Sequence, residues 1–463
     1  MDFTTAFAVW TGGRYPWRRW LALLVVALAL PASPSLLRRH AIPGQWRPER
    51  RVAAGCSRRR GGKDAPGVGR PISEVSSERS ADLRIRLADI SASPSGKLAT
   101  VTTDFQFRDE NLPHRSVLWL FDLYRGKKRL LVDGPLMYFH RDWTNGDRAV
   151  LFTGDDARYS RDKHIALPLR VIDPLNGMVR TLCEPAANSY ISGASWSPNG
   201  RWIAFNRRPF PRKDTAKPGA WLISQDGTTQ KRVAPPGGAG ICWCLGWTPD
   251  GSNRFYLYTP PEGLWIMDPE GHSYKLPIRY ASQASMRVLL PRRGSHFALM
   301  GAIQNYAHDV WIYNVLGQNG RKVDNLENWG SITWSPDGQW LACSDHAKSP
   351  RSRIRTRFHP VGRGESQEYQ TGCAKAESFQ WLAWTTDSRR CGVYNEELHV
   401  VEPRRKRLSP EASLSGTPRG WRSDDRLVVH RRDGLAILST SGEVERLYPT
   451  NDFVPDQRNR TGL

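Results

Sequence analysis

Histidines and aspartates occur as immediate neighbours at two places in the sequence. The pairs are His308-Asp309 and Asp345-His346. Two further histidines, His114 and His164, lie in similar polar segments. Imidazoles and carboxylates serve as general acids and bases, and both are common metal ligands. A fold that gathered these segments would have a cluster suited to proton transfer or metal binding. The alternative is structural: adjacent residues of a strand point to opposite faces, so Asp309 need not face the same way as His308.

Arginines and aromatic residues share the same polar segments, which are residues 103–115, 154–167, 207–219, 301–308 and 345–352. A guanidinium beside an aromatic ring suits carboxylates, sugars or phosphates. Loops of this length in a compact fold are more often functional than short turns, although an ordinary solvated surface is the alternative. We therefore predict a ligand face for a protein or an anionic glycan. Its residues are His114, Arg115, His164, Arg207, Arg208, His308, Asp309, Asp345 and His346.

Signals for covalent catalysis or for zinc binding are missing from the sequence. The string nearest to the serine-hydrolase motif G-x-S-x-G is Gly193–Ser197, which lacks the last glycine. The seven cysteines include no C-x-x-C pair, so buried thiols are expected, with one or two disulfides if the domain is exported. We expect no catalytic residue, cofactor or metal site, and a non-enzymatic protein.

A repeated turn motif must position these segments. The string SWSPNGRWIA at 195–204 recurs as TWSPDGQWLA at 333–342, and GWTPDG at 246–251 is a third copy. Proline fixes φ, Asp or Asn bonds its own backbone and glycine takes a positive φ, so each copy predicts a tight hairpin. With weaker copies, the motif recurs at intervals of 37 to 54 residues, at Gly96, Gly146, Gly200, Gly251, Gly294, Gly338, Ser388 and Asp425. Such intervals are typical of propeller blades.

A second motif follows each copy: an apolar strand, a turn and another strand, as in Leu264–Pro269 (LWIMDP). Near-continuous apolar strands indicate sheets that are packed on both faces. We therefore interpret the repeated tryptophan as packing between neighbouring blades.

These motifs resemble the WD-type repeat of the TolB family and of the propeller domains of prolyl oligopeptidase-like enzymes, over about 370 residues. The resemblance implies an all-β fold, a β-propeller of about eight four-stranded blades. Seven blades is the alternative if the degraded copy near Gly294 belongs to a neighbour. The resemblance covers the propeller part only, since residues 1–80 are too short to supply the α/β domain of TolB. Both turn motifs would lie on one face, and the long polar segments on the other, over the central channel.

The N-terminus has the parts of a secretory signal peptide. Arg14, Arg18 and Arg19 precede the apolar run Leu21–Leu30, and small residues follow. The arginines of the next segment resist translocation, so a signal anchor with a cytoplasmic propeller is the alternative. The predicted organisation is a signal peptide or anchor at 1–37, a basic flexible linker at 38–80, the propeller at 81–450 and a tail at 451–463.

The chain is strongly basic, with a formal net charge of +22, which favours anionic partners. Arg351, Arg353, Arg355 and Arg357 alternate, so they form either a basic stripe or a solvent-facing outer strand. The leading hypothesis is a monomeric, non-enzymatic binding or scaffold protein of the periplasm or cell envelope, with nucleic acid an unlikely ligand. The alternatives are a lyase or hydrolase acting on acidic polysaccharide through the His/Asp residues, and a membrane-tethered cytoplasmic scaffold.

Overall fold

The computed structural model describes most of the repeat region. The described ranges, which omit the single positions 145, 149, 261, 396, 411 and 415, are 83–107, 115–134, 140–153, 168–184, 189–209, 219–237, 241–278, 286–302, 307–327, 331–345, 353–373 and 381–455. The predicted signal segment, the linker and most of the tail lie outside these residues. Within them, no helix is long and apolar enough to cross a membrane. The helices described there are two short 3-10 turns, η4 (Pro403–Arg405) and η5 (Thr450–Phe453).

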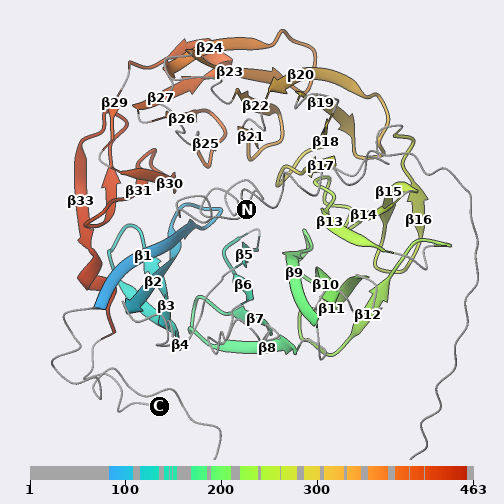
Figure 1. Ribbon diagram of the computed structural model, residues 1–463, viewed down its shortest axis with the longest axis horizontal. Coiled ribbons are helices and arrows are strands. Elements are labelled where there is room, and N and C mark those ends of the chain that lie inside the picture. The colour runs from blue at the N-terminus through green and yellow to red at the C-terminus, as the bar shows by residue number, and fades with distance from the viewer. Residues whose placement is uncertain are drawn as a thin grey trace, which may run out of the picture. The chain divides into compact units, whose positions relative to one another are not determined.

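The strands form eight antiparallel sheets, each built from consecutive strands (Figure 1). Blades 1 to 4 consist of β1 (Leu83–Ala92), β2 (Leu98–Phe107), β3 (Arg115–Asp122), β4 (Lys128–Gly134); β5 (His140–Trp143), β6 (Val150–Thr153), β7 (Leu169–Ile172), β8 (Val179–Cys183); β9 (Ser189–Trp196), β10 (Trp202–Pro209), β11 (Gly219–Ser224), β12 (Gln230–Val233); and β13 (Trp243–Trp247), β14 (Phe255–Thr259), β15 (Gly263–Met267), β16 (Ser273–Lys275). Blades 5 to 8 consist of β17 (Met286–Leu289), β18 (His296–Ala302), β19 (Ala307–Asn314), β20 (Arg321–Glu327); β21 (Ser331–Trp334), β22 (Trp340–Ser344), β23 (Arg353–Pro360), β24 (Gln367–Cys373); β25 (Trp381–Trp384), β26 (Cys391–Asn395), β27 (Glu397–Glu402), β28 (Arg407–Leu408) with β29 (Ala412–Ser413); and β30 (Thr417–Trp421), β31 (Leu427–His430), β32 (Gly434–Leu438), β33 (Val444–Pro449).

Seven of these sheets have four strands, and the blade 7 sheet has a fifth, β29, which pairs with β27. The predicted all-β propeller is therefore confirmed, with eight blades rather than seven. The degraded copy near Gly294 lies between β17 and β18 and belongs to a complete blade of its own.

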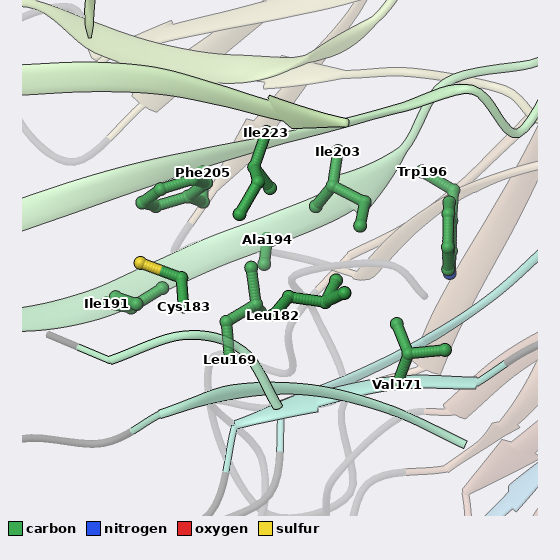
Figure 2. Packing of buried hydrophobic residues seen from close by; sticks show 10 residues of the cluster. All are labelled: Leu169, Val171, Leu182, Cys183, Ile191, Ala194, Trp196, Ile203, Phe205 and Ile223. Atoms are coloured by element: carbon green, nitrogen blue, oxygen red, sulfur yellow. The ribbon is translucent and has the colours of Figure 1, made fainter. Parts of the chain in front are cut away.

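The core of the propeller lies between blades, which is why the strands are apolar on both faces. Figure 2 shows one such layer, where Leu169 and Leu182 of blade 2 meet Ile191 and Phe205 of blade 3. Burying a large aliphatic or aromatic side chain contributes roughly 1.5–3 kcal/mol, so each interface is a substantial share of the stability.

The repeated tryptophans hold neighbouring blades together, as predicted. The indole N–H of Trp247 donates to the carbonyl of Ser195 in the preceding blade, at 3.0 Å. Trp334 donates to Leu289 at 2.9 Å, and Trp421 to Ala383 at 2.9 Å. These three indoles thus fill gaps between sheets and bind a backbone carbonyl of the preceding blade. The indole N–H groups of Trp143, Trp196 and Trp384 are buried without a hydrogen-bond partner among the described residues.

The first hairpin turns of successive blades touch one another. Asn199 N–H donates to Asn253 of the next blade at 3.0 Å, and Gly294 N–H donates to the carbonyl of Pro249 at 3.0 Å. Asp337 N–H donates to Ser388 at 2.9 Å. These blades therefore share one orientation, with the first and third hairpin turns on one face, called here the turn face. The ends of the second strands lie on the opposite face, called here the loop face.

Among the described strands, none is exchanged between blades 8 and 1, since β1 and β33 pair only within their own sheets. Side chains join blade 8 to blade 1 instead. The Phe453 ring of η5 packs against Phe121 at 5.4 Å between centroids, and its carbonyl accepts the Trp119 indole N–H at 3.1 Å. Tyr448 of β33 meets the other side of Phe121, at 4.7 Å.

Candidate functional site

The structure places the described members of the predicted ligand face at the loop-face ends of strands. Arg207 and Arg208 lie near the end of β10, His308 and Asp309 near the start of β19, and Asp345 directly after β22. His114, His164 and His346 lie outside the described residues, and of Arg115 only the backbone, at the start of β3, is described. The predicted histidine cluster is therefore not tested by the structure.

Arg207 and Arg208 each stack on a tryptophan. The Arg207 guanidinium lies 4.3 Å from the Trp221 ring centroid in its own blade, and Arg208 lies 4.3 Å from Trp243 of the next blade. Cation–π contacts of this kind fix the guanidinium plane while leaving its N–H groups able to bind. The Nε atoms of both arginines are buried and have no hydrogen-bond partner among the described residues. A buried N–H group without a hydrogen-bond partner favours the binding of a ligand that supplies an acceptor, such as an anion.

The loop-face end of blades 8 and 1 is also electropositive. Arg419 of β30 is substantially buried, and burial lowers its pKa. At the end of β31, burial and the charges of Arg419 and Arg86 lower the pKa of His430 to about 4. Burial is the main cause of this shift, and the two arginine charges, which add to it, suit a negatively charged ligand.

The described carboxylates of the predicted His/Asp set already have basic partners. Asp309 accepts from the Lys322 ammonium and from the Asn325 amide, both at 2.6 Å. Asp345 accepts from Arg357 Nη2 at 2.6 Å. Both carboxylates therefore act in ion pairs, and His308 beside Asp309 is only 2% exposed.

A different polar cluster joins blades 5 and 6. Asp324 of β20 accepts hydrogen bonds from Arg357 Nε and His359 Nε2 of β23, both at 2.9 Å. Burial alone would raise the pKa of the Asp324 carboxyl, but these hydrogen bonds and the charge of Arg357 hold it below its ordinary value. His359 Nδ1 contacts Ser366 Oγ at 2.7 Å. The cluster thus connects a buried carboxylate to a serine on the surface.

The same cluster contains residue types that bind metals. Donor atoms of Asp324, Cys343 and His359 all lie within 4.8 Å of one another, which is the spacing of a transition-metal site. However, the Arg357 guanidinium contacts the carboxylate oxygen that would bind the metal, and burial raises the pKa of the Cys343 thiol well above its ordinary value. A cation already neutralises the carboxylate and the thiol keeps its proton, so these residues fit a hydrogen-bond network rather than a metal site.

Asp324, His359 and Ser366 belong to no motif of the sequence. The signal closest to them is the alternating arginine series, which predicts a basic stripe or a solvent-facing strand. For Arg357 neither interpretation holds: its side chain is 14% exposed and is ion-paired to Asp324 and Asp345. Arg355 is 53% exposed, as a solvent-facing residue would be, and pairs with Asp345 at 3.6 Å.

The cysteines follow the prediction of buried thiols. Five of them are free and buried in the described structure: Cys183, Cys242, Cys244, Cys343 and Cys391.

Comparisons with known proteins agree with the fold. No known family model matches the chain, and no curated protein is similar to it. Among solved structures, the chain is similar to TolB from Acinetobacter baumannii, at 15% identity and a TM-score of 0.36 over 64% of this chain and 68% of that one. It is similar to oligogalacturonate lyase in complex with manganese, at 11% identity and 0.44 over 67% and 87%. It is also similar to apo prolyl oligopeptidase B from Galerina marginata, at 12% and 0.44 over 75% and 50%. The likeness agrees with the predicted TolB-like propeller and concerns the fold alone.

Proposed function

We propose that this protein is a binding propeller of the cell envelope whose loop face takes an anionic ligand, either an acidic glycan or a carboxylate-bearing protein segment. One observation carries the proposal: two arginines at the loop-face end of β10 stack on tryptophans and keep buried donor atoms without a partner among the described residues. The positive charges of Arg419 and Arg86 near His430 support it.

Polygalacturonate is a suitable probe, because every sugar of the chain carries a carboxylate. We expect the double variant Arg207→Gln/Arg208→Gln to bind it at least about tenfold more weakly than the native protein by isothermal titration calorimetry, a change of ~1.4 kcal/mol. The matched control is Arg201→Gln, which removes an exposed arginine from the same blade on the turn face. Binding by the control should stay within about twofold of native.

Two results would contradict the proposal. If the native protein does not bind polygalacturonate, the acidic-glycan part of the proposal is wrong. If Arg201→Gln weakens binding as much as the double variant, the interaction reflects only overall charge. The lyase alternative is separable in the same samples, because a lyase would release unsaturated products that absorb ultraviolet light and binding alone would not.

A further inference from the structure

The hydrogen bonds around His359 determine which partner each of its ring nitrogens faces. A carboxylate that accepts hydrogen bonds from Arg357 and His359 is ionised, so it only accepts, and His359 Nε2 must carry the proton that it donates at 2.9 Å. In a neutral imidazole the other nitrogen, Nδ1, is then an acceptor. With the imidazole neutral, Ser366 Oγ, 2.7 Å away, donates its own proton to Nδ1. Proton donation therefore runs from Ser366 to His359 and from His359 to Asp324.

Solvent exposure differs sharply among the three hydrogen-bonded residues. The His359 and Asp324 side chains are 2% and 6% exposed, whereas Ser366 lies exposed in the turn between β23 and β24. The orienting carboxylate and the base are thus held rigidly in the interface between two blades. The hydroxyl group is the one member of the chain that a solute can reach.

Ser366 also lines a pocket of about 630 Å³ on the turn face. Trp340, Pro360 and Tyr369 give the pocket apolar walls. Arg363 and Lys406 bring positive charge to it from two neighbouring blades, and Glu365 and Glu368 bring negative charge. Such a pocket has room for a small organic molecule and offers both charged and apolar contacts to it.

We propose that Ser366, His359 and Asp324 are the nucleophile, base and orienting acid of a site that hydrolyses small carboxylic esters bound in this pocket. This activity is independent of the loop-face ligand, since Ser366 lies at the opposite end of the strands. β23 runs from the loop face to Pro360, which pairs with Trp340 directly after the first hairpin turn.

The reaction needs only these three residues, the ester and one water molecule. Ser366 Oγ attacks the ester carbonyl carbon while its proton passes to His359 Nδ1. The carbon–oxygen bond to the alcohol then breaks, and the alcohol leaves with that proton. Water attacks the acyl-serine and gives its proton to His359, and release of the carboxylic acid returns the proton to Ser366 Oγ. Asp324 keeps the imidazole in the required tautomer throughout.

A wholly structural role would use the same contacts, because Ser366 and Asp324 also satisfy a buried histidine. The two roles differ in reactivity. The test compares Ser366→Ala with Ser441→Ala, which removes an exposed serine from the corresponding turn of blade 8. Purified protein would be treated with a fluorophosphonate probe, mapped by mass spectrometry, and assayed with p-nitrophenyl acetate.

We expect the probe to label Ser366 and not Ser441. We also expect Ser366→Ala to lose about 10²- to 10⁴-fold of the ester hydrolysis while Ser441→Ala retains it. Absence of labelling at Ser366, or equal hydrolysis by the two variants, would overturn the proposal. Zinc or EDTA should leave the rate unchanged, because no step uses a metal.

A second measurement does not depend on a substrate that fits the pocket. In Ser366→Cys the base would take the thiol proton, so alkylation by iodoacetamide at neutral pH should be at least about tenfold faster than in Ser441→Cys. Adding His359→Gln to Ser366→Cys should remove the difference. Equal alkylation rates for the two single cysteine variants would mean that His359 does not activate position 366.

Discussion

Asp324 accepts from two side chains of the neighbouring blade, and this makes it the polar centre of the blade 5–blade 6 interface. Arg357 has its remaining donors on Asp345, so its charge lies between two carboxylates. An ion pair buried this deeply is costly to form but more costly to break, because removal of one partner leaves the other charge unpaired.

Asp324→Asn should therefore destabilise the protein by roughly 3 kcal/mol at pH 7 in urea unfolding, the scale of a broken buried ion pair. The pKa of Asp324 is lower in the folded state than in the unfolded chain. Its contribution to the free energy of unfolding is therefore fully present at a pH above the ordinary aspartate pKa. This contribution is lost as the pH falls through the pKa of the folded state. The variant should accordingly lose less stability than the native protein between pH 5 and pH 3.

Asp433→Asn is the control, since Asp433 also pairs with an arginine but is 49% exposed. It should change stability little, because exposed pairs are screened by solvent. Equal effects of the two substitutions would show that the Asp324 network does not stabilise the interface.

At the scale of the blade, the same turn motif serves two different purposes. Gly200 and Gly338 occupy equivalent positions with φ of +71° and +65°, a conformation that favours glycine. A Cβ at Gly200 would meet nothing within 4 Å, whereas a Cβ at Gly338 would collide with the carbonyl oxygen of Arg293 in the preceding blade. The turn itself needs the glycine in both blades, but only blade 6 needs it for close approach.

Gly200→Ala should therefore cost about 1–2 kcal/mol, the strain of a left-handed backbone, in thermal or urea unfolding. Gly338→Ala should cost clearly more, because the backbone of blade 5 must also move. A cost for Gly338→Ala no greater than that for Gly200→Ala would mean that the two turns can separate freely.

The contrast between blade and site explains what the sequence could predict. Pro, Asp or Asn and Gly within four residues determine a turn locally, so three full copies of the motif, with five weaker ones at similar intervals, were enough to predict about eight blades. Asp324, His359 and Ser366 have no comparable pattern. Asp324 lies in the outer strand of one blade and His359 in the third strand of the next, and only packing between the blades brings them together. The arginines on β10 were found because they begin a long polar segment after an apolar run, whereas the role of Trp243 depended on the neighbouring blade.

The whole ring depends on how its ends meet. Because no strand of the described propeller is exchanged, the seam between blades 8 and 1 is held there by side chains such as Phe121, Tyr448 and Phe453. Tyr124 also contacts Ser423 across the seam at 2.5 Å. Phe453 is fully buried although it follows the last strand.

Phe453→Ala should cost about 3–5 kcal/mol, as do other truncations of buried phenylalanine. Hydrogen exchange should then accelerate mainly in β1–β4 and β30–β33. Phe255→Ala, also fully buried but in the layer between blades 3 and 4, should cost as much without affecting the seam. If Phe453→Ala leaves exchange in blades 1 and 8 unchanged, other contacts close the ring.

The proposed location in the cell envelope leads to a prediction about the whole chain. Burial raises the pKa of Cys242 to about 11 and that of Cys244 to about 12, so neither thiol is reactive and an oxidising compartment would not force them to pair. The described propeller is thus compatible with export, and the sequence offers an apolar run at Leu21–Leu30 behind Arg14, Arg18 and Arg19. N-terminal sequencing of the native protein from cell fractions should find a mature start near residues 30–36 in an exported fraction. An intact Met1 in the membrane fraction, with the propeller protected from external protease, would contradict export and would direct the search for the anionic ligand to cytoplasmic partners.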